Sequence, residues 1–269
     1  MARGRVAKVL TTRYEDGGVR RAPDELIVEE PLEIRLDDAL VATTMRTPGH
    51  DFELAAGFCF TEGLLAGAPV QTCRYCGTGS AVDTGFNVVS VETGGKAPVP
   101  TPRLGTTTSS CGLCGSASLD ELSQRLDPLV DPTPFALEVL AHVPGSLAEA
   151  QDLFTATGAV HAAAAFTAAG DAVLVREDVG RHNAVDKVVG RLLLDGRLPA
   201  SGLGLYVSGR ASFEIVQKAW AAGFPAVVAV SAPTSLAVDT ARRAGVTLAG
   251  FVRDGRMNVY APERVAAER

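Results

Sequence analysis

The fold is indicated most clearly by residues 172–209, AVLVREDVGRHNAVDKVVGRLLLDGRLPASGLGLYVSG. Residues 172–178 form an apolar run typical of a strand, 180–193 have the period of an amphipathic helix, and 202–209 resemble a second strand. A strand, a helix and another strand in this order are typical of an α/β unit with a largely parallel sheet.

The same alternation continues on both sides of this stretch. The sequence predicts further helices at 146–158, 212–223 and 235–245, and further strands at 159–167, at 226–231 and on both sides of Asp254-Gly255. Residues 146–269 are therefore predicted to form one three-layer α/β/α domain.

The first part of the chain, residues 1–145, predicts a smaller, strand-rich α+β domain. Two extended runs meet at Asp37-Asp38 in a predicted hairpin. A helix should follow, with Asp51 as its N-cap and Cys59 on its buried apolar face. Residues 93–117 have no period and almost no large apolar side chains, so we predict a mobile loop there, followed by a linker into the second domain.

Charge and hydropathy exclude several classes of partner. The formal net charge is -6, which argues against a broad surface for nucleic acid or anionic membranes. No apolar run has the length of a secretory signal or a membrane span. We therefore expect a cytoplasmic protein with neither a nucleic acid nor a membrane as its partner.

Four of the five cysteines form two C-x-x-C pairs, Cys73 with Cys76 and Cys111 with Cys114. In a reducing compartment such pairs suit metal, redox or sulfur chemistry. All four thiols could hold structural zinc, although 34 residues separate the pairs. Thioredoxin-like cycling is less favoured, because no strand leads directly into either pair. A sulfur carrier fits the small neighbours Gly112 and Gly115, which leave a partner room to approach Cys111.

The strand-to-helix junctions of the second domain are candidates for binding an anion. Residues 176–187, 208–212 and 231–235 place helix starts, hydroxyl groups and cationic side chains at what should be one edge of the sheet. These features predict a groove for a phosphate group or a nucleotide. Helix caps and surface charges at Arg176, Glu177 and Asp178 are the alternative explanation.

The order of predicted elements resembles the cytidine deaminase fold. Zinc deaminases need H-x-E at one helix start and P-C-x-x-C at the next. Here the matching positions are His182-Asn183-Ala184 and Ser208-Gly209-Arg210. Neither the catalytic carboxylate nor the thiol ligands are present, so we expect a deaminase-like fold without the deaminase reaction.

Longer motifs carry a resemblance that covers most of the chain. The strings SSCGLCG at 109–115 and REDVGRHNAVDK at 176–187 occur together with PGHDFELAAGF, GAVHAAA, SGRASFEIVQKA and FVRDGRMNVY. With these motifs the chain resembles the FdhD family, the sulfurtransferases required for formate dehydrogenase activity.

The resemblance implies a sulfur relay in a homodimer. A cysteine desulfurase would leave a persulfide on Cys111, with Cys114 as the second thiol. The sulfur would pass to a molybdenum or tungsten bis-pyranopterin guanine dinucleotide (bis-molybdopterin guanine dinucleotide) cofactor before its insertion into formate dehydrogenase. A nucleotide resembling guanosine diphosphate is a further expected ligand.

The residues expected to bind the cofactor come from two sources. The resemblance implies the segment Phe251, Val252, Arg253, Asp254, Gly255 and Arg256. The strand-to-helix junctions add Arg181, His182, Asn183, Lys187, Ser208, Gly209 and Arg210. The alternative function is a nucleotide-binding chaperone that holds the cofactor without transferring sulfur and is stabilised by zinc on Cys73, Cys76, Cys111 and Cys114.

Overall fold

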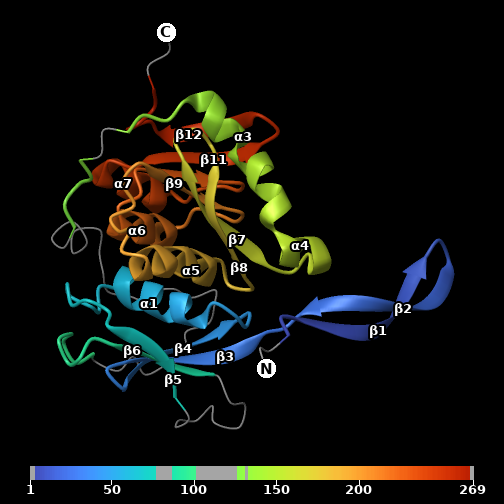
Figure 1. Ribbon diagram of the computed structural model, residues 1–269. Helices are drawn as coiled ribbons and strands as arrows, with labels where there is room; N and C mark the ends of the chain where they lie inside the picture. Colours follow the sequence, from blue (N-terminus) through green and yellow to red (C-terminus); the bar gives the residue numbers. More distant parts are fainter. Residues whose placement is uncertain (1–3, 77–86, 101–125, 131–132, 267–269) are drawn as a thin grey trace.

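The computed structural model describes residues 4–76, 87–100, 126–130 and 133–266. The larger of its sheets has six strands in the order β12-β11-β10-β9-β7-β8 (Figure 1). These strands are β7 (His161–Thr167), β8 (Ala172–Asp178), β9 (Leu203–Val207), β10 (Ala226–Ala229), β11 (Thr247–Arg253) and β12 (Arg256–Ala261).

The expectation of a largely parallel sheet is wrong in one respect. Strands β9, β10 and β11 are parallel, but β7 pairs antiparallel with both β8 and β9, and β12 pairs antiparallel with β11. The physical reason is the short connection between β7 and β8 and between β11 and β12, because tight turns can join only antiparallel strands.

Helices cover both faces of this sheet, so the sheet is the middle of three layers. Helices α5 (Arg181–Leu194), α6 (Phe213–Ala222) and α7 (Ser235–Ala244) pack against one set of alternating strand residues, including Leu205 and Val227. Helix α3 (Leu137–Leu147) packs against the opposite set, including Tyr206 and Val228. The inner strands β7, β9 and β10 thus bury both of their faces, as their nearly continuous apolar sequences require.

The single helix predicted at 146–158 is instead the end of α3, a short 3-10 turn η2 (Ala148–Ala150) and helix α4 (Asp152–Thr157). The Glu177 carboxylate of β8 accepts the N–H groups of Leu153 and Phe154 at 2.9 and 2.8 Å, so α4 begins anew there. The division predicted between residues 145 and 146 falls inside α3, whose apolar face packs on the six-stranded sheet.

The N-terminal sheet has four strands in the order β4-β3-β6-β5. They are β3 (Glu30–Leu36), β4 (Ala39–Arg46), β5 (Thr72–Tyr75) and β6 (Val88–Glu92), and helix α1 (Asp51–Thr61) covers one face. The hairpin predicted at Asp37-Asp38 is confirmed, with both residues in the left-handed region.

The prediction that Asp51 caps α1 is wrong. His50 takes the cap position with a φ of 58° and makes no side-chain cap hydrogen bond. The Asp51 carboxylate instead accepts two hydrogen bonds from Arg46, at 3.1 and 2.9 Å. A cation from a neighbouring strand therefore outcompetes the backbone N–H groups that a capping aspartate would bind.

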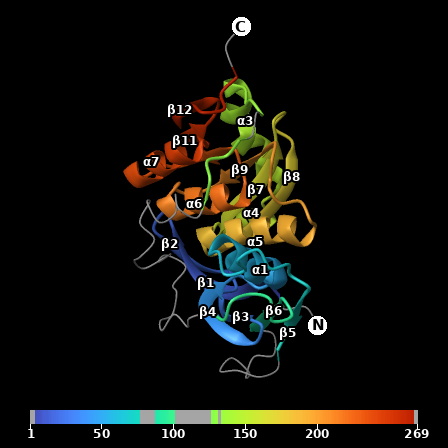
Figure 2. The same cartoon turned by 90° about the vertical axis from the view of Figure 1, so that its left-hand side faces the viewer.

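Helices α1 and α5 join the two sheets, and in both views they lie side by side (Figures 1 and 2). A Cβ atom on Gly57 would lie 1.9 Å from the Asp186 carbonyl oxygen, and one on Gly190 would lie 1.8 Å from the Glu53 carbonyl oxygen. Glycine at both positions lets the two helix backbones touch.

An unpredicted two-stranded ribbon extends away from these layers (Figure 1). Strands β1 (Val6–Glu15) and β2 (Gly18–Ile27) pair along their full length around the turn at Asp16-Gly17. Both faces are largely exposed, so the ribbon lacks the apolar alternation that identifies a half-buried strand. Among the described residues, no helix is both long and apolar enough to cross a membrane.

Candidate functional site

The cofactor-binding segments predicted from the sequence lie along one edge of the six-stranded sheet. Backbone hydrogen bonds connect the loops that leave β9 and β10 with the last part of β11: Ser231 N–H donates to the Gly209 carbonyl at 3.4 Å, and Phe251 N–H donates to the Ser231 carbonyl at 3.2 Å. This is the carboxyl edge of the parallel strands, where ligands usually bind in open α/β sheets.

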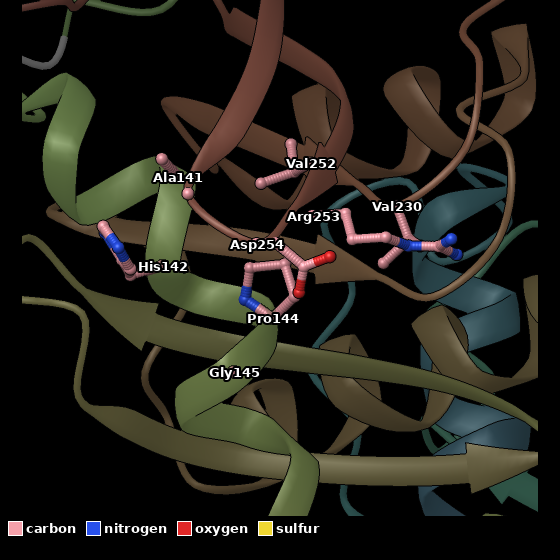
Figure 3. Close-up of a pocket in the computed structure, with 9 residues that line it drawn as sticks. Ala141, His142, Pro144, Gly145, Val230, Val252, Arg253 and Asp254 are labelled. Carbon is pink, nitrogen blue, oxygen red and sulfur yellow. The ribbon is translucent and has the colours of Figure 1, made fainter.

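A pocket of about 260 Å³ opens at this edge between α3 and the turn that joins β11 to β12 (Figure 3). Its lining residues are Ala141, His142, Pro144, Gly145, Val230, Val252, Arg253, Asp254 and Gly255. In Figure 3 the Arg253 guanidinium lies on the side of Val230, and His142 lies on the opposite side of the view.

The turn between β11 and β12 has a left-handed backbone. Asp254 and Gly255 have φ values of 50° and 73°, and a Cβ on Gly255 would lie 3.2 Å from His142 Nε2. His142 Nδ1 lies 2.8 Å from the Glu138 carbonyl, which can only accept, so Nδ1 donates. The other ring nitrogen, Nε2, therefore faces the Gly255 backbone of this turn.

Much of the REDVGRHNAVDK motif is buried between the two sheets. The Asp178 carboxylate is fully buried and accepts hydrogen bonds from Thr47 N–H, Gly180 N–H and Asn183 Nδ2 at 2.8 to 3.1 Å. Lys187 Nζ lies 2.7 Å from Asp178 Oδ2 and donates to the Thr47 carbonyl at 3.0 Å. This network ties the start of α5 to the segment between β4 and α1.

A second buried charge cluster lies between α5 and α6. Lys218 Nζ donates to both oxygens of Asp186, at 2.9 and 3.0 Å, and to Thr61 Oγ1 at 2.9 Å. Burial lowers the pKa of Lys218, but Asp186 and Glu62 outweigh it and raise the pKa above its ordinary value. One ammonium thus faces two carboxylates, and burial raises the pKa of Asp186 above its ordinary value.

These networks separate the predicted cofactor-binding residues into two groups. Asn183 and Lys187 are buried, and their polar atoms contact Asp178 and the backbone of residues 45–47. Arg181, His182, Ser208, Gly209 and Arg210 lie at the carboxyl edge. The Ser208 hydroxyl accepts the Ala162 N–H at 2.9 Å, so it also stabilises the β7–β9 pairing.

The charges at Arg176, Glu177 and Asp178 are not free surface charges. Arg176 donates to Glu53 at 2.9 Å, Glu177 binds the start of α4, and Asp178 binds Lys187. Sequence reasoning also missed His142 and His161, because a single histidine in a helix or strand has no distinctive spacing. The sequence analysis explained Asp178 as a cap or surface charge, so its buried ion pair with Lys187 was not predicted.

Cys111 and Cys114 lie outside the described residues. Burial of Cys59 is confirmed, and it raises the pKa of that thiol well above its ordinary range. Burial, with Glu92, also raises the pKa of Cys73 to about 11. Both thiols are therefore protonated at neutral pH, which makes them weak nucleophiles.

Cys73 and Cys76 are on opposite faces of the sheet at β5. Cys73 packs into the apolar cluster under α1, and Tyr75, two residues on, donates to Asp51 of that helix. Arg74 and Cys76 take the other face, with Arg74 Nη1 donating to Cys76 Sγ at 3.3 Å. Within the described ranges, no three His, Cys, Asp or Glu side chains gather to hold a metal ion. A zinc site that uses both thiols would require β5 to rearrange.

Comparisons with known proteins identify the family of this chain. The sequence model of the FdhD/NarQ family matches residues 27–266. A sulfur carrier protein FdhD of Streptomyces avermitilis is 53% identical over 266 residues, covering 96% of this chain and 94% of that protein. A sulfur carrier protein FdhD of Mycobacterium tuberculosis is 50% identical, covering 88% of this chain and 90% of that protein.

The fold is also similar to a crystal structure. A formate dehydrogenase accessory protein from Desulfotalea psychrophila matches with a TM-score of 0.75 and 26% identity, covering 98% of this chain and all of that one. The chain therefore belongs to the FdhD/NarQ family. The expected family is confirmed, whereas the likeness to cytidine deaminases stays a prediction.

Proposed function

We propose that this protein is a sulfur carrier that accepts sulfur on Cys111 and delivers it to a molybdenum or tungsten bis-pyranopterin guanine dinucleotide cofactor before formate dehydrogenase receives that cofactor. The observation that carries the proposal is the family membership, with relatives at about 50% identity along most of the chain that are called sulfur carrier proteins. The Cys111 and Cys114 pair supplies the chemical group that such a role needs.

Loading needs no oxidant. The Cys111 thiolate attacks the outer sulfur of a cysteine desulfurase persulfide, and the desulfurase cysteine leaves as a thiolate. One S–S bond forms and one breaks, so the sulfane sulfur moves without a net change in oxidation state. Cys114 is the second thiol: its thiolate can attack the inner sulfur of the Cys111 persulfide, so that the bond to the outer sulfur breaks, a Cys111–Cys114 disulfide forms and the outer sulfur leaves as sulfide.

The carboxyl edge of the six-stranded sheet supports the choice of substrate. The pocket at Arg253, Asp254 and Gly255 combines an apolar lining with a carboxylate and a guanidinium, a combination suited to a purine base. A guanine presents adjacent N–H donors that the Asp254 carboxylate can accept together. The chain acts as a homodimer in the cytoplasm in this proposal.

Mass spectrometry after incubation with a cysteine desulfurase and cysteine tests the proposal. The protein should gain one sulfur atom that a reductant removes, and Cys111→Ala should gain none. Cys76→Ala is the matched control, because it removes a free thiol from β5 and should still gain the sulfur. Sulfur gain by Cys111→Ala, or restored formate dehydrogenase maturation in cells carrying that variant, would refute the carrier role.

The zinc-dependent chaperone makes the opposite prediction. It requires bound zinc by elemental analysis and loss of that metal in both Cys73→Ala and Cys111→Ala. The opposite orientations of Cys73 and Cys76 favour the sulfur carrier over this alternative.

A further inference from the structure

The ribbon of β1 and β2 has one face that carries exposed apolar side chains. Its register places Leu10 opposite Pro23 and Tyr14 opposite Val19. Alternate residues of a strand point to the same side, and directly opposite residues share a face, so these four side chains lie together. Leu10, Tyr14 and Val19 are 57%, 71% and 69% exposed. We call this side of the ribbon its apolar face.

The opposite face of the ribbon is covered by the same chain. It carries Ala22, which is buried, and β2 contacts helix α4. The ribbon extends away from the other layers (Figure 1), and among the described elements none covers the apolar face. A hairpin of two strands is marginally stable in water by itself, and exposed groups of apolar side chains often mark a protein interface.

The order of side chains along the apolar face is symmetric. From the base of the ribbon to its tip, the cross-strand pairs are Val6 with Ile27, Lys8 with Glu25, Leu10 with Pro23, Thr12 with Arg21, and Tyr14 with Val19. The first, third and fifth pairs are apolar, and the second and fourth are polar or charged. The pattern therefore reads the same from either end, as a surface that binds a copy of itself requires.

We propose that the apolar face packs against the apolar face of a second copy of this chain, with the two ribbons antiparallel about a two-fold axis near Leu10. Tyr14 and Val19 then lie over the apolar pair at the base of the other ribbon. Glu25 faces Arg21 of the partner subunit, so the charged pairs are complementary as well.

The size of the ribbon fits such a contact. Strands of 10 residues give a face about 34 Å long, and two strands are about 10 Å wide. Stacking two such faces buries on the order of 1,000 Å² in total, close to the lower limit for a specific interface. We therefore expect a dimer that dissociates on dilution. The inference deepens the proposed function, on which it rests for the homodimer, by naming the surface that joins the copies.

Sedimentation velocity of the full chain over a series of concentrations tests the interface. The wild-type protein should form dimers, and Leu10→Asp should weaken them about a hundredfold, because each dimer contains two substituted residues near the axis and each costs about tenfold. Ala7→Asp is the matched control, because it adds the same charge at an exposed position on the opposite face and should leave the dimer unchanged. A wild-type protein that stays monomeric, or equal dimerisation of the two variants, would overturn the proposal.

A charge exchange tests the antiparallel arrangement. Arg21→Glu should weaken the dimer about tenfold, because it would face Glu25 of the partner subunit. The double variant Arg21→Glu/Glu25→Arg should restore wild-type dimerisation. Both positions are solvent-accessible, so these variants keep the test decisive even where Leu10→Asp fails to fold. A double variant no better than Arg21→Glu would contradict the arrangement.

The outcomes separate this interface from the proposed function. Cys111→Ala should dimerise like the wild type, so loss of the sulfur carrier role leaves the interface intact. A dimer that Leu10→Asp does not weaken would overturn the interface while leaving the homodimer of the proposed function in place.

Discussion

Two charged regions meet at α5, and they differ in how their charges are matched. In the interface with α1 and β4, Lys187 faces Asp178 at 2.7 Å and is 1% exposed. At the carboxyl edge, Arg181 Nε is buried without a hydrogen-bond partner among the described residues, and burial and Arg210 lower the pKa of Arg181 although Glu214 opposes them. Removing one partner of a buried ion pair leaves an uncompensated charge and destabilises the fold, whereas an exposed cation can be removed at little cost.

Removing the ammonium of Lys187 is the most severe test of this comparison. Lys187→Met should cost about 3–5 kcal/mol of unfolding free energy, because the Asp178 carboxylate would stay buried without its partner. Chemical denaturation measures the loss. Lys8→Met, at a side chain 81% exposed, is the control and should change stability little. A loss below about 1 kcal/mol in Lys187→Met would mean that the pair does not stabilise the interface.

The second-largest effect is expected at the backbone contact between α1 and α5. Gly57→Ala should cost about 2–3 kcal/mol, because its Cβ would lie 1.9 Å from the Asp186 carbonyl oxygen and the helices must separate. Gly145→Ala in α3 meets no atom within 4 Å and should be neutral or slightly stabilising. Equal thermal unfolding temperatures for the two variants would contradict the close helix contact.

The ion pair between Glu53 of α1 and Arg176 of β8 makes the free energy of unfolding depend on pH. Burial raises the pKa of Glu53, but hydrogen bonds and charge from Arg176 and His50 outweigh it and lower the pKa to about 2. Because the folded pKa lies below the ordinary value, this stabilisation is complete above about pH 4.5 and is lost as the pH falls towards 2.

Glu53→Gln should therefore be less stable than the wild type at pH 7, by about 1–2 kcal/mol after allowance for solvent screening. The difference should shrink steadily below pH 4.5. Denaturation curves of both proteins between pH 7 and pH 2.5 measure it. A difference that stayed constant over this range would show that the carboxylate charge contributes nothing.

The smallest effect on stability is expected at the carboxyl edge, the second region of the comparison. Arg210→Gln should change the free energy of unfolding by less than about 0.5 kcal/mol, because the side chain is exposed and has no described ion pair. Thermal unfolding without any ligand measures it. A loss as large as that of Lys187→Met would place Arg210 among the residues that stabilise the fold.

Periodicity predicted most of the elements correctly. The apolar run at 172–178 and the helix that begins near Gly180 occur as β8 and α5. Errors arose where a side chain from a neighbouring strand decided the outcome: Glu177 of β8 starts α4 anew, and Arg46 of β4 takes Asp51 away from the cap of α1. Local propensity contains no information about such contacts.

The candidate site was predicted less completely than the fold. Spacing and motif identified Arg181, Arg210 and the segment 251–256, which the structure places along one edge. The sequence alone could not show that Asn183 and Lys187 face inward while Arg181 faces the edge, because all three residues lie within two turns of one helix.

The sequence by itself determined the α/β alternation, the family and the presence of a thiol pair, because these depend on residue order and local period alone. Only the tertiary structure decided which cations of REDVGRHNAVDK are paired, because a charge is neutralised by whatever packs against it, however distant in sequence. Lys187 meets Asp178 and Thr47 across the two sheets, whereas Arg181 meets Gly209 and another arginine.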